Sequence, residues 1–241
     1  MAIFLIFLNF IFSYNSDPTS KSDDTNYYLN NNPASINKSI VFGYSPNNFG
    51  VSELDKVYLS LNFNKNYYSF NIGINADNNT LNREFDFYIG GNYKYKNLFQ
   101  IGVRGHYINS KIKNYSNENN LYLDIGAIIK FDSLFIGSYF NNIYLTNNQY
   151  YQYFRTAVSY SENQFSFYLG PEIIINKYYG LNTGIKYRIL DNIHFRVNYS
   201  SIYQTFNSTL SLIFNKYIIN LSLSKHNSLG YSHDYQFIYD Y

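Results

Sequence analysis

The stretch EFDFYIGGNYKY, residues 84–95, alternates apolar and polar side chains. In an extended chain Phe85 and Ile89 point to one face, while Glu84 and Asp86 point to the other. The alternation has a period of two, which indicates a β-strand and not a helix. One face of this strand is apolar and the other is polar and charged. The question for the rest of the chain is what lies against each face.

The same alternation recurs from Ser39 to the last residue, and no window has helical spacing over a useful length. Most of the segments have nine to thirteen residues, longer than the five or six typical of globular strands and close to the length that crosses a bilayer at a tilt. We predict fourteen strands, at residues 39–45, 55–63, 66–75, 83–95, 98–109, 119–131, 134–145, 152–161, 164–175, 181–190, 193–201, 204–214, 217–225 and 231–241.

The connections alternate in length. Polar pairs such as Lys96-Asn97, Asp132-Ser133 and Asp191-Asn192 are typical of tight hairpin turns. The intervening connections are mostly longer, among them NKYYG at residues 176–180. Short periplasmic turns and longer outer loops are the pattern of an outer-membrane barrel. We therefore predict an all-β fold, a 14-stranded antiparallel up-and-down transmembrane β-barrel, with both termini on the periplasmic side.

Composition agrees and excludes other classes. Aromatic residues make up 21% of the chain and charged residues only 14%, against about a quarter in soluble domains. The net charge is +2, so nothing favours nucleic acid as a partner, and the absence of Cys excludes disulfides and thiolate metal sites. No Ser/His/acid arrangement and no set of metal ligands lies at a convincing spacing. We expect no enzyme activity, no cofactor, no catalytic residue and no metal site.

The chain begins with an apolar run from Ala2 to Phe12, interrupted only by Asn9. It is too short for a spanning helix and is typical of the core of a secretory signal peptide, although no Lys or Arg precedes it. A buried strand or helix is the alternative. We expect a signal peptide over residues 1–16, a linker or hatch over 17–38 and the barrel over 39–241.

Just before the first strand, Asn32, Pro33 and Ala34 combine a rigid residue with small neighbours. Such a segment can tuck into the mouth of a barrel as a short lumenal hatch. The alternative is a linker with an ordinary proline turn, and the residues alone do not decide between the two.

In a membrane barrel the apolar face of each strand meets lipid and the polar face lines the lumen, because a charge facing lipid at the midplane costs about 2–4 kcal/mol. These side chains either form ion pairs that support the barrel or line a permeation path or binding surface. Our candidate lumen-lining residues are Glu84, Asp86, Arg104, His106, Asp124, Lys186, Arg188, His194 and Arg196.

The chain ends in the alternating stretch YSHDYQFIYDY, residues 231–241. Because a barrel in lipid must leave no sheet edge unpaired, we predict that this stretch is the closing strand and pairs with the first strand near Ile40. A terminal aromatic after alternating residues is also typical of the signal that barrel-assembly machinery reads. The candidate residues for closure and assembly are Tyr235, Phe237, Tyr239 and Tyr241.

Three segments in this order resemble the PorV/PorQ-type outer-membrane proteins, relatives of the FadL-type barrels. They are NNPASI before the first strand, YSPNNFGVSEL after it, and HNSLGYSHDYQFIY at the end. The resemblance covers residues 30–241 and implies a 14-stranded barrel. Family members of this kind serve type IX secretion, whereas FadL-type relatives pass hydrophobic small molecules.

Three functions stay open at this point. The resemblance implies an outer-membrane protein associated with protein secretion or surface attachment, whose partners would be secretion-system components or secreted cargo. The alternatives are a FadL-like channel for hydrophobic or small solutes, and a structural outer-membrane protein without transport. In each case the expected surroundings are outer-membrane lipid and the barrel-assembly machinery, in the outer membrane of a Gram-negative bacterium.

Overall fold

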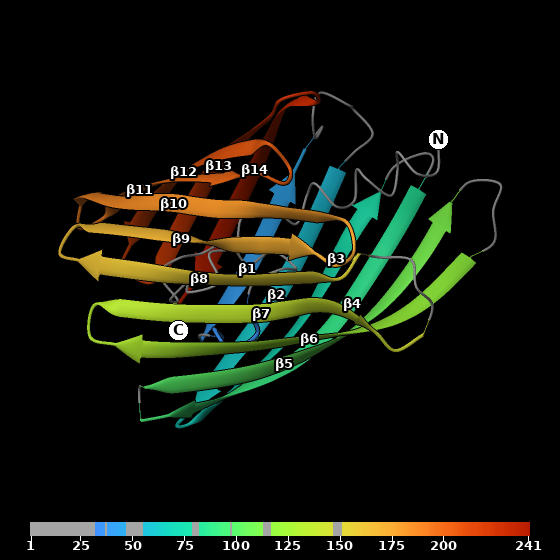
Figure 1. Cartoon of the computed structure of the whole chain (residues 1–241), viewed down its shortest axis with the longest axis horizontal. Helices are drawn as coiled ribbons and strands as arrows, with labels where there is room; N and C mark the ends of the chain where they lie inside the picture. Colours follow the sequence, from blue (N-terminus) through green and yellow to red (C-terminus); the bar gives the residue numbers. More distant parts are fainter. Residues whose placement is uncertain are drawn as a thin grey trace.

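The computed structural model of the protein describes residues 32–36, 38–46, 55–78, 82–96, 98–112, 117–146 and 151–241. Over these residues the chain forms one closed barrel of fourteen strands, which confirms the predicted fold (Figure 1). The strands are β1 (Ser39–Ser45), β2 (Asp55–Lys65), β3 (Tyr68–Asn78), β4 (Asn82–Tyr95), β5 (Phe99–Ile112), β6 (Asn117–Phe131), β7 (Leu134–Tyr144), β8 (Tyr153–Glu162), β9 (Phe165–Ile174), β10 (Tyr178–Leu190), β11 (Ile193–Ser200), β12 (Thr205–Phe214), β13 (Tyr217–His226) and β14 (Gly230–Tyr239).

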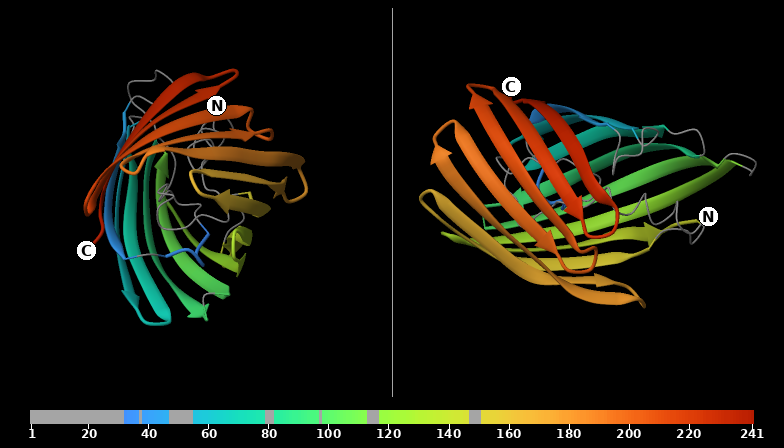
Figure 2. Two further views of the ribbon diagram at one scale, coloured as in Figure 1. Left: turned by 90° about the vertical axis from the view of Figure 1, so that its left-hand side faces the viewer. Right: turned by 90° about the horizontal axis from the view of Figure 1, so that it is seen from above.

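Each strand pairs antiparallel with its neighbours in the sequence, and β1 pairs with β14 to close the sheet. At this seam Ile40 lies opposite Tyr239, and Phe42 opposite Phe237. The two further views in Figure 2 show the strands wrapped around a common axis. Closure gives both edges of the sheet a partner, as lipid requires.

The two faces of the barrel differ sharply in chemistry. Ile89 and Phe70 point outward with 60% and 57% of their side chains exposed, whereas the inward Asn62 and Asn220 are 1% and 0% exposed. All fourteen strands carry at least one exposed large apolar side chain. Soluble proteins rarely expose apolar patches of more than a few hundred Å². The outer wall is therefore a lipid-facing surface.

Among the described residues, no helix is long and apolar enough to cross a membrane.

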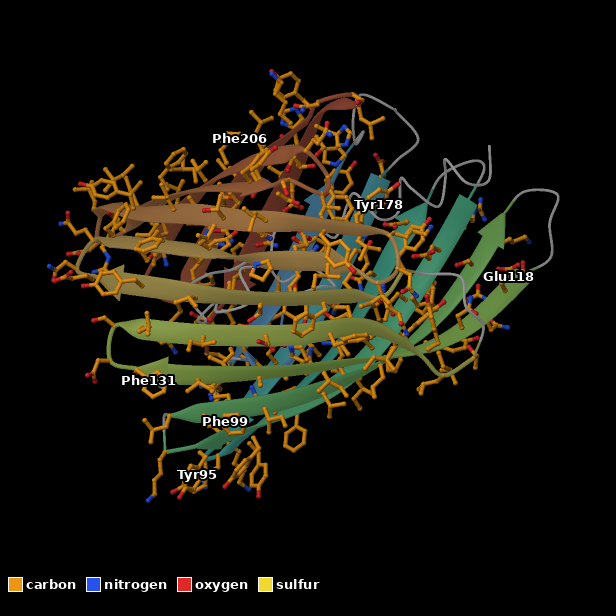
Figure 3. All side chains as sticks on the ribbon, in the orientation of Figure 1. Tyr95, Phe99, Glu118, Phe131, Tyr178 and Phe206 are labelled. Atoms are coloured by element: carbon orange, nitrogen blue, oxygen red, sulfur yellow. The ribbon has the colours of Figure 1, made fainter. Side chains whose placement is uncertain are left out.

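The tight turns lie at one end of the barrel. Figure 3 shows the outward side chains of Tyr95, Phe99 and Phe131 gathered at this end, and Glu118 and Tyr178 at the other. In most of these turns the first residue is Asn or Asp with a left-handed backbone conformation. These two residue types tolerate that conformation better than other non-glycine residues. The φ angles are 55° at Asn66, 44° at Asp132, 50° at Asn163 and 53° at Asn215.

The contrast in loop length is weaker than the sequence predicted. The connections at the far end include two long ones, residues 46–54 and 145–152, but also three-residue turns at 175–177 and 227–229. The prediction of a loop over residues 176–180 was wrong, because Tyr178 and Tyr179 pair with Ile174 and Ile173 and extend the β9–β10 hairpin.

Inside the wall, tyrosines cover glycines on the neighbouring strand. In each case the two residues are direct partners in the register and both point inward. A Cβ on the glycine would come within about 1.8–2.4 Å of the tyrosine ring. The pairs are Gly43 with Tyr58, Gly73 with Tyr88, and Gly184 with Tyr168. Aromatic cover of a strand glycine helps to hold the register.

We expect Gly73→Val to destabilise the barrel by about 1–3 kcal/mol, because the added methyl groups displace the Tyr88 ring. The measurement is the urea midpoint for folding into lipid vesicles. Gly105→Val is the matched control: Gly105 points outward, and its nearest neighbour to an added Cβ is a backbone oxygen 4.0 Å away. Equal midpoints for the two variants would contradict the proposed role of the glycine–tyrosine pairs.

The chain end is held by several contacts. The Tyr241 hydroxyl donates to the Asn62 carbonyl oxygen at 2.9 Å, and its ring stacks on Tyr239 with centroids 6.1 Å apart. The Lys38 ammonium lies 4.4 Å from the Tyr241 ring centre. The last residue therefore ties β14 to the segments around the seam.

Deleting Tyr241 should lower the folded fraction in the outer membrane more than deleting Asn147 from the long β7–β8 connection. The reason is that Tyr241 contacts Asn62, Tyr239 and Lys38 around the seam. Heat-modifiable mobility on gels measures the folded fraction for each variant. Normal folding without Tyr241 would show that the terminal aromatic is dispensable.

Candidate functional site in the barrel lumen

A buried ionic cluster lies on the inner wall. The His106 imidazole on β5 sits between two carboxylates, with Nδ1 3.1 Å from Asp86 on β4 and Nε2 3.1 Å from Asp124 on β6. All three side chains are nearly inaccessible to solvent. A carboxylate only accepts hydrogen bonds, so both ring nitrogens must donate, and a ring that donates twice is an imidazolium. The cluster joins three adjacent strands through charge-assisted hydrogen bonds.

Polar partners extend this cluster in both directions. Asn75 on β3 donates to Asp86 at 3.0 Å, and the backbone N–H of Asn142 on β7 donates to Asp124 at 3.0 Å. Asn142 has φ 58° and lies in a bulge, where β7 places two residues opposite Asp124 on β6. The bulge thus aims a backbone N–H at a buried carboxylate, a common use of such irregularities.

A second buried ion pair lies farther round the wall. Arg155 on β8 donates to Glu172 on β9 from Nε at 2.7 Å, and from its terminal nitrogen to the Tyr139 hydroxyl at 2.6 Å. Ser200 on β11 donates to the other Glu172 oxygen at 2.9 Å. Each charge is therefore paired and hydrogen-bonded, the condition under which burial of charge is tolerated.

Part of the loop end of the lumen is apolar instead. Tyr153 on β8, Ile174 on β9 and Tyr203 in the β11–β12 turn form a buried cluster, joined by the partly buried Tyr151 and Leu229. The Tyr153 and Tyr203 rings lie 6.3 Å apart. Burial raises the pKa of the Tyr203 hydroxyl, which keeps it neutral. We call these five residues the mouth cluster.

The mouth cluster depends on a turn that folds inward. A Cβ on Gly180 of β10 would meet the Ser201 hydroxyl at 2.4 Å and Ile202 at 2.5 Å. The backbone N–H of Leu181 also donates to the Ser201 hydroxyl at 2.7 Å. The missing side chain at Gly180 therefore lets the β11–β12 turn lie against the inner wall.

Nearer the tight turns, the segment Asn32–Ala34 lies against the inside of the barrel. The Asn32 side-chain amide donates to the carbonyl oxygens of Ala127 on β6 and Ser138 on β7, both at 3.1 Å. The Ala34 carbonyl oxygen accepts from the Asn92 side chain on β4 at 2.6 Å. This segment is buried and bonded to three strands.

Two paired glycines make room for it. Gly102 on β5 and Gly126 on β6 are direct partners in the register. A Cβ on Gly102 would lie 2.1 Å from the Pro33 carbonyl oxygen, and one on Gly126 would lie 1.8 Å from the Asn32 side-chain oxygen. Any larger residue at either position must shift the segment.

The structure places the predicted residues as follows. Six of the predicted lumen-lining residues are buried on the inner wall: Asp86, Arg104, His106, Asp124, His194 and Arg196. Glu84 and Lys186 are partly exposed, and Arg188 is exposed near a tight turn. Asp86, His106 and Asp124 meet in one cluster, whereas His194 lies six strands away on β11. On the closing strand Tyr235 and Phe237 point outward, with Tyr239 and Tyr241 partly exposed. The expected signal peptide over residues 1–16 lies outside the described part of the chain.

Sequence reasoning missed Arg155, the Lys56–Asp77 ion pair and the mouth cluster. Lys56 Nζ lies 3.4 Å from Asp77. The alternation of YFRTAVSY, residues 153–160, puts Arg155 in phase with Tyr153, so the pattern could have found it. The turn residue Tyr203 lies outside any alternating stretch, so no such signal existed there.

The fold is shared with known outer-membrane channels. The CymD monoaromatic hydrocarbon channel aligns with 88% of this chain and 91% of its own, with TM-score 0.69 and 10% identity. The Pseudomonas putida toluene transporter TodX aligns over 89% and 93%, with TM-score 0.63 and 10% identity. A Pseudomonas aeruginosa FadL homologue aligns over 88% and 93%, with TM-score 0.57 and 9% identity. No family model and no curated protein matches this chain.

At such identities the likeness concerns the fold, which is that of FadL homologues and related outer-membrane channels. Together with the lipid-facing outer wall, it places this protein in the outer membrane of a Gram-negative bacterium.

We expect His106→Ala to lower the free energy of unfolding by about 3–5 kcal/mol, because it removes the imidazole that pairs with both buried carboxylates. Urea titration of the barrel in lipid vesicles measures the loss. Adding Asp86→Asn and Asp124→Asn to this variant should restore part of it. The control is His233→Ala on the exposed face of β14. A loss no larger than that of this control would contradict a stabilising role of the ionic cluster.

Proposed function

We propose that this protein is a FadL-like outer-membrane channel for small hydrophobic solutes. The observation that carries the proposal is the mouth cluster, an apolar and aromatic patch at the loop end of a lumen whose wall also carries buried charged residues. A hydrophobic solute gains free energy there in proportion to the apolar area it covers.

The arrangement of residues between the mouth cluster and the tight turns favours a gated channel and not an open pore. The ionic clusters follow the mouth cluster along the wall, and the Asn32–Ala34 segment lies beyond them toward the tight turns. That segment is held by hydrogen bonds and by the bare backbone of two glycines. Such contacts can be broken and remade, so the segment acts as a hatch.

The similar structures support the same class of solute. CymD is described as a monoaromatic hydrocarbon channel and TodX as a toluene transporter. A role in protein secretion, which the PorV/PorQ resemblance implies, finds no support in the fold or in these comparisons and stays a prediction.

The test is uptake of labelled toluene by a Gram-negative host that lacks its own hydrophobic channels. Expression of the protein should raise the initial rate several-fold over the empty vector, and Tyr153→Ser, which replaces part of the mouth cluster, should return it toward that baseline. A folded, outer-membrane-inserted barrel that leaves toluene uptake at the vector rate would contradict the proposal.

The hatch is tested in planar bilayers. Gly102→Val should displace the Asn32–Ala34 segment and turn small, infrequent currents into a larger steady conductance. Gly105→Val on the outer face of the same strand should leave the conductance unchanged. Equal conductance for the two variants would mean that the segment does not obstruct the lumen.

A further inference from the structure

The lipid-facing wall carries a groove over β3 to β6. It has a volume of about 410 Å³ and is lined almost entirely by apolar atoms, among them those of Tyr68, Phe70, Tyr93, Val103 and Ile125. It lies on the outside of the barrel, because these side chains belong to the exposed phase of their strands. Asn92 and Gly102, which belong to the inward phase, complete its lining, and its outward side chains make it open toward lipid.

The register explains why the wall is hollow here. One row of outward residues runs Phe63, Phe70, Gly91, Val103 and Ile125 across five adjacent strands. Gly91 leaves a gap in that row between a phenyl ring and a branched side chain. A Cβ on Gly91 would make tight contacts, at 3.3 Å from the Ser69 carbonyl oxygen and 3.4 Å from Phe70, with no atom closer.

One end of the groove lies at the membrane interface on the side of the tight turns. The next row toward the turns contains Lys65, Tyr68 and Tyr93, which are direct partners across β2, β3 and β4. The Tyr68 and Tyr93 rings lie 5.3 Å apart and close that end of the groove. Short turns are periplasmic, so the groove faces the inner leaflet, which consists of phospholipid.

Two lysines stand above this end. Lys65 is the last residue of β2 and points outward, and Lys96 lies in the β4–β5 turn with its ammonium 5.4 Å from the Tyr95 ring centre. Neither takes part in an ion pair with another described residue. Figure 3 shows Tyr95 and Phe99 at this same end of the barrel.

We propose that this groove binds one anionic phospholipid of the inner leaflet. An acyl chain lies along the gap at Gly91, between Phe70 and Val103, and the headgroup phosphate meets Lys65 and Lys96. Apolar lining with cations at one end matches an acyl chain that ends in a negative headgroup. Lysines near a membrane surface each favour anionic over neutral lipid about fivefold.

Because the chain has no Trp, a single introduced Trp reports on the lipid beside it. Phe63→Trp puts the reporter next to Phe70, and Phe167→Trp puts it on the outward face of the distant β9, where its register partners are Tyr160 and Ile185. Each variant is reconstituted in vesicles that contain brominated phosphatidylglycerol or brominated phosphatidylcholine, and quenching gives their relative association constant. We expect phosphatidylglycerol to be favoured about fivefold or more at Phe63→Trp, with near parity at Phe167→Trp.

Two changes separate the groove from the headgroup site. Gly91→Leu fills the groove, and Lys65→Gln with Lys96→Gln removes the cations; each should bring the Phe63→Trp reporter to parity. Gly105→Leu, also an outward glycine but outside the groove, should keep the preference. Equal association constants for the two lipids at Phe63→Trp without further changes would overturn the proposal. An undiminished preference for phosphatidylglycerol in the double lysine variant would also overturn it. The lysine variant decides the matter even if Gly91→Leu fails to fold, since both lysines are exposed at the surface.

Discussion

The pairing of β1 with β14 is the constraint on which the rest of the structure depends. In lipid an unpaired backbone N–H or C=O has no water to bond, so an open sheet of this length could not stay in a membrane. Once the sheet closes, every strand has a lipid face and a lumen face, and each side chain is assigned to one of them. The apolar belt, the inward tyrosine–glycine pairs and the buried charges all follow from that division.

The lumen wall combines rigid and adaptable parts. Charged residues that would be unstable against lipid are paired inside, as in the Asp86–His106–Asp124 cluster and the Arg155–Glu172 pair. These pairs bridge neighbouring strands and stiffen the wall between the mouth cluster and the Asn32–Ala34 segment. Toward the two ends of the lumen the contacts are uncharged. They are apolar packing in the mouth cluster and neutral hydrogen bonds at the Asn32–Ala34 segment. The proposed solute path would need movable parts at its ends and a stable wall between them.

Glycine has three distinct uses in this wall. At Gly73 it lies beneath a tyrosine, at Gly102 it leaves room for the Pro33 backbone, and at Gly91 it hollows the lipid face. In each case the missing side chain is filled by something else: a ring from the next strand, another segment of the chain or, as proposed, a lipid.

Much of the fold could be predicted because a strand pattern with period two is local. Fourteen strands and their inward and outward faces followed from alternations such as residues 84–95, and the strand ends fell within three residues of those observed. The loop over residues 176–180 was misplaced because turn residues there continue to pair as strand.

The site was harder to predict from the sequence, because the pairing register of the strands brings its residues together. Asp86, His106 and Asp124 could be assigned to the lumen one by one, but not to a single cluster. The Asn32 side chain bonds to Ser138, 106 residues away, and no local pattern encodes such a contact. The room for the Asn32–Ala34 segment depends on Gly102 and Gly126 being register partners, which only the paired strands reveal.

Closure of the barrel between β1 and β14 can be tested by disulfide cross-linking, because the chain contains no native cysteine that could form a competing disulfide. Phe42 lies opposite Phe237 at the seam, whereas Tyr235 is displaced by two residues. Cysteines at 42 and 237 should form a disulfide in the outer membrane under mild oxidation, and cysteines at 42 and 235 should form far less. Absence of the first cross-link in the folded protein, or equal yields for the two pairs, would contradict a barrel closed in this register.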